Sequence, residues 1–194
     1  MQKKKIILAS GSPRRKELLA RMGLEFDLMP CDADEKYDKS LSPVQVVEHL
    51  AKLKAGITNK MVKDCIVIGA DTIVAVDQLI LGKPEDKAEA YEMIKKLSGR
   101  WHDVITGICM YENDEYIIEH EITRVHFVKM SDNEIEKYIN TDEPYDKAGA
   151  YGVQGLAGMY IDSIEGDYYN IMGFPMAKIR NMLKSLSVID GMKG

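Results

Sequence analysis

The feature that most constrains the fold is a run of twelve mostly apolar residues, Cys65–Val76, which reads CIVIGADTIVAV. Its β-branched content is typical of a strand, and it is longer than most strands in globular proteins. Asp77 and Gln78 then predict a turn into a short further strand, Leu79–Leu81. Helical patterns alternate with such β-rich stretches along the chain, so we expect an α/β protein with a mixed, elongated sheet.

Helix starts are marked by serine followed by proline, at Ser12-Pro13 and at Ser42-Pro43. A serine N-cap with proline at the first helical position favours helix initiation, and Gln45 completes a capping box at the second start. We expect helices over residues 13–23, 43–57, 86–97, 131–139 and 175–186. We expect strands over residues 6–9, 65–76, 79–81, 101–110, 116–128 and 159–164, and a loop over 141–158.

Length and charge exclude several classes of protein. A chain of 194 residues suits a single domain over 1–194, with two lobes and no separable linker. A net charge of −5 argues against a nucleic-acid partner. No apolar stretch reaches the ~20 residues of a membrane span, and the apolar part of the N-terminus is too short for a signal peptide. We therefore expect a cytoplasmic protein with no membrane partner, in which Cys31, Cys65 and Cys109 are reduced.

Two adjacent arginines, Arg14 and Arg15, fall in the first turn of the first predicted helix. Unpaired backbone N–H groups and the positive end of the helix dipole make this an unfavourable place for a cation, at roughly 0.3–1 kcal/mol. The placement is explained if an anion binds there. We therefore expect these arginines to contact an anionic ligand.

Two further charged residues interrupt apolar patterns. Lys54 lies on the same helical face as Val47 and Leu50, and it either reaches along the core edge to water or serves a site. Asp71 interrupts the long apolar strand, where an unpaired carboxylate costs several kcal/mol or takes up a proton. Asp71 is therefore either hydrogen-bonded to a neighbouring turn or placed to hold a metal or orient a water.

The unusual residues together suit a metal-bound polyphosphate. Lys83 follows a predicted strand, and Glu35 lies in an acidic polar stretch. Either residue alone would be read as an ordinary surface charge, and each is a candidate only because the other unusual charges are present. Arginine and lysine neutralise phosphate oxygens, while carboxylates hold Mg²⁺ and a water. The chain has no GxxxxGK[ST] or GxGxxG phosphate-binding motif and no histidine pair at metal-ligand spacing.

Ordered motifs from residue 8 to about residue 186 resemble the Maf family of nucleoside triphosphate pyrophosphatases. The motifs are LASGSPRRKELL (8–19), the Glu35 loop, LAKLKA (50–55), GADTIV (69–74), LGKP (81–84), LSGRWH (97–102) and EPYDKAGAYGVQG (143–155). The resemblance implies a fold like that of inosine triphosphate pyrophosphatases, with a long twisted mixed sheet and two lobes around a central cleft. It also implies a homodimer.

By the same resemblance, the activity is hydrolysis of a nucleoside triphosphate to the monophosphate and pyrophosphate with Mg²⁺ or Mn²⁺. Asp71, as the proton acceptor, and Glu35 are implied as the catalytic residues, and the same two carboxylates are implied as the metal ligands. The residues implied in substrate and phosphate binding are Ser10, Ser12, Arg14, Arg15, Lys54 and Lys83.

The nucleobase is expected to be uracil or thymine. The amide of Gln154 offers a donor and an acceptor that complement this edge, although it could serve adenine or merely tie down its Gly-rich loop. The motifs GADTIV and YGVQG resemble the subgroup acting on dTTP and UTP, which implies specificity roles for Arg14, Thr72 and Gln154. Gly149, Gly152 and Gly155 are expected to let the loop backbone approach a flat ring.

The resemblance implies two physiological roles, house-cleaning of nucleotide pools and a link to septum formation. An alternative function is a nucleotide-binding regulator of septum formation without significant catalysis. Such a regulator needs the arginines and lysines but not the Glu35 and Asp71 pair, so the sequence favours the enzyme.

Overall fold

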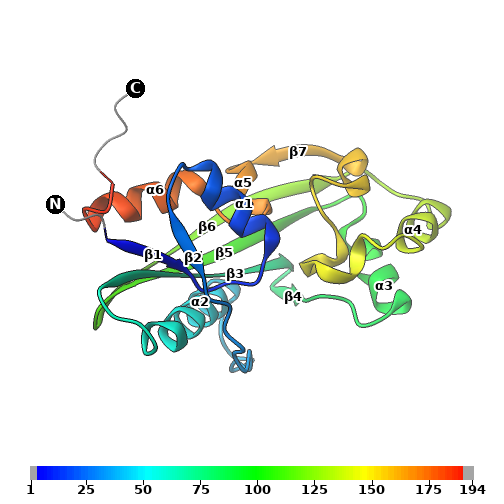
Figure 1. Ribbon diagram of the computed structural model, residues 1–194. Helices are drawn as coiled ribbons and strands as arrows, with labels where there is room; N and C mark the ends of the chain where they lie inside the picture. Colours follow the sequence, from blue (N-terminus) through cyan, green and yellow to red (C-terminus); the bar gives the residue numbers. More distant parts are fainter. Residues whose placement is uncertain (1–3, 190–194) are drawn as a thin grey trace. The chain divides into compact units, whose positions relative to one another are not determined.

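A computed structural model describes residues 4–189, in which strands and helices alternate along the chain (Figure 1). The strands are β1 (Lys5–Leu8), β2 (Phe26–Leu28), β3 (Cys65–Val76), β4 (Leu79–Leu81), β5 (Trp101–Glu112), β6 (Glu115–Phe127) and β7 (Ile161–Glu165). The α-helices are α1 (Pro13–Arg21), α2 (Pro43–Asn59), α3 (Lys87–Leu97), α4 (Asp132–Ile139), α5 (Tyr168–Ile171) and α6 (Met176–Ser185). Three short 3₁₀ helices are η1 (Pro144–Asp146), η2 (Ala148–Ala150) and η3 (Leu156–Tyr160).

The strands form one mixed sheet in the order β2-β1-β3-β5-β6-β7, with β4 paired to β3. β1 pairs in parallel with β2 and with β3, whereas β3 with β4 and β6 with β7 are antiparallel. The prediction of an α/β protein with a mixed sheet is confirmed. No helix within residues 4–189 has the length and apolar character needed to cross a lipid bilayer.

The chain divides into two compact units, which we call unit 1 and unit 2. Unit 1 contains residues 1–71, 106–121 and 173–194, and unit 2 contains residues 72–105 and 122–172. β3, β5 and β6 each contribute residues to both units, and β3 passes from one to the other after Asp71. That the two units form one domain stays a prediction.

Unit 1 is built around α2, which lies on one face of the sheet while α1 and α6 lie on the other (Figure 1). α2 begins with the predicted capping box, in which Ser42 and Gln45 each accept a hydrogen bond from the other's backbone N–H. A Cβ on Gly69 of β3 would lie 2.5 Å from the carbonyl oxygen of Ala51, so only glycine allows this close approach of strand and helix. The register of α2 on the sheet follows from that contact.

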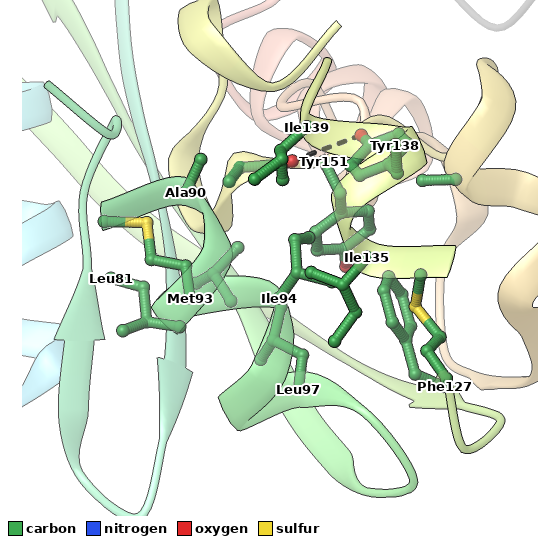
Figure 2. Close-up of a cluster of buried hydrophobic side chains, with 14 of the residues drawn as sticks. Leu81, Ala90, Met93, Ile94, Leu97, Phe127, Ile135, Tyr138, Ile139 and Tyr151 are labelled. Carbon is green, nitrogen blue, oxygen red and sulfur yellow. Dashed lines mark hydrogen bonds between the residues drawn. The ribbon is translucent and has the colours of Figure 1, made fainter. Parts of the chain in front are cut away.

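Unit 2 has its own hydrophobic core between α3 and α4 (Figure 2). Ile94 and Leu97 of α3 pack with Ile135 of α4 and with Phe127, and all four side chains are buried. Tyr151 packs edge-on against Phe127, with ring centroids 4.9 Å apart. This core fixes the backbone that leads into the predicted loop 141–158.

The predicted elements are largely confirmed, and the differences concern short segments. Asp77 and Gln78 have φ of 50° and 66°, which is the two-residue hairpin geometry that matches strand twist. β2 and α5 are not expected from the sequence, because three or four residues carry too little periodicity to be recognised. The predicted loop 141–158 contains η1, η2 and the start of η3, since its turns are tight enough to form i→i+3 hydrogen bonds.

The only buried histidine among the described residues is His102, in unit 2. Its Nε2 lies 2.7 Å from the Tyr151 hydroxyl, and its Nδ1 has no hydrogen-bond partner within the described residues. Burial lowers the pKa of His102 from 6.5 to about 3, and the nearby His126 acts in the same direction. The side chain is therefore neutral at physiological pH.

We predict that this histidine weakens the fold in mild acid. With a folded-state pKa of about 3 and an unfolded-state pKa of 6.5, only the unfolded chain binds this proton between those values. The stabilisation is complete above pH 6.5 and is lost as pH falls toward 3, by on the order of 2 kcal/mol between pH 7 and pH 5. Urea unfolding of the wild type and of His102→Gln at pH 7 and pH 5 measures this effect. The free energy of unfolding of the variant should fall by about 2 kcal/mol less than that of the wild type. Equal acid destabilisation of both proteins would contradict the prediction.

Candidate active site

The connection from β1 to α1 gathers polar groups around a helix start. Ser12 caps α1 by accepting a hydrogen bond from the Arg15 backbone N–H, and the Ser12 N–H donates to Ser10 Oγ at 3.2 Å. Pro13 occupies the first turn, and no acidic side chain lies in that turn. The helix dipole and the half-buried Arg14 side chain thus make this end of α1 electropositive.

Arg15 binds backbone carbonyls of unit 1. Its Nε donates to the Gly173 carbonyl at 2.9 Å, and one terminal nitrogen donates to the Ala70 carbonyl at 2.8 Å and to Ser10 Oγ at 3.4 Å. Burial lowers the pKa of Arg15, an effect that the Asp71 carboxylate opposes. The fixed fork of a guanidinium can serve several acceptors at once, so Arg15 joins β1, β3 and the segment before α6.

Lys54 links the carboxylates of two distant segments. It follows the buried face of α2, and its Nζ lies 2.6 Å from Asp71 Oδ1 and 2.8 Å from Glu35 Oε1. Its side chain is only 14% exposed. The ammonium of Lys54 thus ends on two carboxylates and not in open water, and its role in a site stays a prediction.

Asp71 lies within β3, with its side chain 10% exposed. Burial raises the pKa of this carboxyl, while Lys54 and Arg15 lower it and Glu35 raises it. Asp71 Oδ1 accepts a hydrogen bond from Lys54 Nζ, and the residue lies in the interior of β3 and not at its end. Asp71 is thus a buried carboxylate that pairs with Lys54, and the charge of Arg15 also favours its ionised form.

Glu35 comes from the irregular stretch between β2 and α2 and is 57% exposed. The stretch is tied to α2 at its start, where the half-buried Cys31 thiol donates to the Lys54 carbonyl at 3.5 Å. The stretch that carries Glu35 is therefore anchored to Lys54 of α2, the same residue that the Glu35 carboxylate contacts.

The two carboxylates converge on a single cationic atom, which is an arrangement that also suits a metal ion. Within residues 4–189 no group of three or more His, Cys, Asp or Glu side chains is placed to hold a metal. Mg²⁺ commonly takes one or two protein carboxylates and completes its shell with waters and substrate phosphates. The residues present thus fit a metal that arrives with a phosphate ligand.

Three of the predicted site residues belong to unit 2. Thr72 follows Asp71 on β3 and is half-buried, and Lys83 is exposed just after β4. Gln154 is exposed in a turn that the hydrogen bond from the Gly155 N–H to the Gly152 carbonyl closes at 3.1 Å. Each is thus accessible at least in part within its own unit.

That the three loop glycines let the backbone approach a flat ring stays a prediction, and in the structure protein side chains occupy the position that a Cβ on each of them would take. A Cβ on Gly149 would lie 2.8 Å from the Val74 side chain, one on Gly152 2.9 Å from that of Lys147, and one on Gly155 2.2 Å from the Glu143 carboxylate. The glycines are required by packing inside unit 2. Glu143 begins the EPYDKAGAYGVQG motif, and its carboxylate accepts hydrogen bonds from two backbone N–H groups. The sequence does not predict this role, because a single glutamate carries no signal for binding backbone amides.

We predict that Arg15→Lys destabilises the fold by about 2 kcal/mol, because lysine leaves at least one buried carbonyl unsatisfied, at roughly 1–3 kcal/mol each. Arg21→Lys is the matched control, since Arg21 is exposed on the same helix and pairs only with Glu17 among the described residues. Urea unfolding should show a lower midpoint for Arg15→Lys alone. Equal midpoints for the two variants would mean that the Arg15 contacts contribute nothing.

Comparisons with known proteins place this chain in a family. Residues 5–186 match the family described as Maf-like protein. A protein of Alkaliphilus oremlandii named dTTP/UTP pyrophosphatase is 48% identical over 185 residues, covering 94% of this chain and 96% of its own length. Proteins of the same name from Caldicellulosiruptor bescii and Aquifex aeolicus are 45% and 41% identical, and each alignment covers at least 96% of both chains.

A structural comparison agrees at the level of the fold. The Staphylococcus aureus Ham1 protein superimposes with a TM-score of 0.51 at 16% identity, covering 94% of this chain and 96% of that one. The expected fold, that of the inosine triphosphate pyrophosphatases, is confirmed in its class. The match over residues 5–186 and the identity to relatives of equal length show that the chain belongs to the Maf-like protein family.

Proposed function

We propose that this protein hydrolyses dTTP and UTP, and uridine triphosphates with modified bases, to the nucleoside monophosphate and pyrophosphate. The observation that carries the proposal is the convergence of Glu35 and Asp71 on Lys54 Nζ, at 2.8 and 2.6 Å. Relatives at 41–48% identity bear the name dTTP/UTP pyrophosphatase. The expected subgroup is thus the one that these names describe.

The triphosphate is proposed to bind at the start of α1. Backbone N–H groups of a first helical turn attract phosphate, and the Ser10 and Ser12 hydroxyls and the Arg14 guanidinium add donors. Arg15 shapes this loop by holding Ser10 and the Ala70 carbonyl. Lys54 and Lys83 are proposed to neutralise further phosphate oxygens.

Mg²⁺ or Mn²⁺ is proposed to be held by Glu35 and Asp71 together with phosphate oxygens. When bound, the metal supplies a Lewis acid and a water of lowered pKa.

Asp71 is proposed to accept the proton of the attacking water. The water oxygen bonds to the α-phosphorus, the bond from that phosphorus to the bridging oxygen breaks, and pyrophosphate leaves. Burial raises the Asp71 pKa, which makes the carboxylate a better base than an exposed aspartate. Lys54 and Arg15 keep Asp71 ionised until it takes the proton and offset the negative charge that develops on the phosphates.

Selection of the base is assigned to Arg14, Thr72 and Gln154. The Gln154 side chain is exposed on a closed turn, where its amide can pair with the carbonyl and imide N–H edge of uracil or thymine. Purines are proposed to be excluded because the pocket is too small for them.

The regulator of septum formation stays the alternative, with no observation that favours it over the enzyme. Burying the charged carboxylate of Asp71 is energetically unfavourable even when it is paired with Lys54, and a protein that only binds nucleotides does not need this carboxylate. A role in house-cleaning of nucleotide pools, a cytoplasmic location and a homodimer remain proposals from the family resemblance.

We predict that Asp71→Asn keeps the fold and lowers kcat for UTP by about 10²–10⁴-fold, because asparagine cannot accept the proton. Asp64→Asn is a matched control, since Asp64 is exposed in a turn with φ of 54° that asparagine also adopts. Pyrophosphate release measures the rate and circular dichroism checks the fold. Near-normal release by Asp71→Asn would overturn the assignment of the base.

We predict that the wild type, supplied with Mg²⁺, hydrolyses dTTP and UTP ahead of CTP, ATP and GTP in a comparison of kcat/KM, and that a chelator abolishes this activity. Gln154→Ala should reduce the preference by about tenfold or more and slow the best substrate less, because an unpaired base edge discriminates while the metal site stays intact. Nucleotide binding without pyrophosphate release would favour the regulator, and equal hydrolysis of GTP and UTP would refute the pyrimidine preference.

A further inference from the structure

The turn that carries Gln154 is anchored on both sides within unit 2. Before the turn, the Tyr151 ring is buried and its hydroxyl lies 2.7 Å from His102 Nε2. After the turn, the backbone N–H groups of Leu156 and Ala157 donate hydrogen bonds of 2.6 and 3.1 Å to the Glu143 carboxylate. The exposed turn between these two anchors is therefore held in place at both of its ends.

The Glu143 carboxylate is surrounded by hydrogen-bond donors. Its Oε1 accepts from the Tyr138 hydroxyl at 3.0 Å and from Ala157, and its Oε2 accepts from Leu156. Tyr138 is buried in the core of unit 2 (Figure 2). Its hydroxyl also approaches the Ala150 carbonyl at 3.1 Å. An ionised carboxylate only accepts hydrogen bonds, whereas an amide in its place would turn an NH₂ group toward a donor.

The contact with Glu143 leaves no space for a side chain at position 155. A Cβ on Gly155 would lie 2.2 Å from Glu143 Oε2. On the other side of the turn, the stem of Lys147 packs beside Gly152, and its Nζ donates to the Glu143 carbonyl at 2.7 Å. Backbone and carboxylate are therefore fitted to each other at one position.

We infer that Glu143 is a positioning residue that sets the base selectivity of the enzyme by holding the Gln154 turn. The inference rests on the proposed function, in which the Gln154 amide contacts the base. Glu143 binds the two amides next to that turn and not the substrate. A hydrogen-bonding group discriminates between bases only if it is held within about 0.5 Å of its working position. Releasing the turn thus lowers discrimination between uracil and cytosine, which differ at the edge that Gln154 reads.

The test compares Glu143→Gln with Glu136→Gln, which makes the same chemical change at an exposed position of α4. Hydrogen exchange of the Leu156 and Ala157 amides should be about tenfold faster or more in Glu143→Gln alone, because their acceptor is weakened. The ratio of kcat/KM for UTP to that for CTP should fall about tenfold, while the kcat for UTP falls less.

A second variant and a double mutant separate selectivity from general damage. Gly155→Ala pushes the turn away from Glu143 without removing the carboxylate, so it should lower the same ratio even if Glu143→Gln folds poorly. Glu143→Gln combined with Gln154→Ala should have no lower a ratio than Gln154→Ala alone, because both changes remove one interaction.

The outcomes distinguish the inference from the function on which it rests. A wild type that does not hydrolyse UTP overturns the proposed function and this inference together. A wild type that prefers UTP, with an unchanged ratio in both Glu143→Gln and Gly155→Ala, overturns the inference alone. Multiplying losses in the double mutant, or unchanged exchange of the two amides, would also overturn it.

Discussion

The buried carboxylate of Asp71 is the constraint around which unit 1 is arranged. An isolated ionised carboxylate in an apolar strand is strongly unfavourable, so the chain has to supply compensating cations. Lys54 supplies one from α2, and Arg15 acts from α1 through the field it shares with Asp71. Helix α2 must therefore lie close to β3, and Gly69 provides the room for it.

The two arginines at the start of α1 carry the same chemical group but have different surroundings. Arg15 spends its donors on the carbonyls of Ala70 and Gly173, so its charge also serves to connect strands and loops. Arg14 remains on the helix start, where the dipole favours an anion. A pair of arginines in a first turn is thus explained partly by protein structure and partly by the proposed ligand.

In unit 2, polar side chains hold the exposed turn that carries Gln154. They do so through the acceptor-only carboxylate of Glu143, the buried Tyr138 and the His102–Tyr151 contact. Because His102 stays neutral, it contributes this contact without placing a charge in the core.

The sequence by itself determined the α/β class, the capped starts of α1 and α2, the hairpin at Asp77–Gln78 and the identity of the unusual charges, because these depend on local periodicity and turn chemistry. Only the tertiary structure decided that Lys54 joins Glu35 to Asp71, that Arg15 binds carbonyls, and that Gly155 faces Glu143. Backbone carbonyls and amides are present at every residue, so no sequence pattern marks the few that side chains distant along the chain will bind. Their partners are selected by packing between segments, which the order of residues does not reveal.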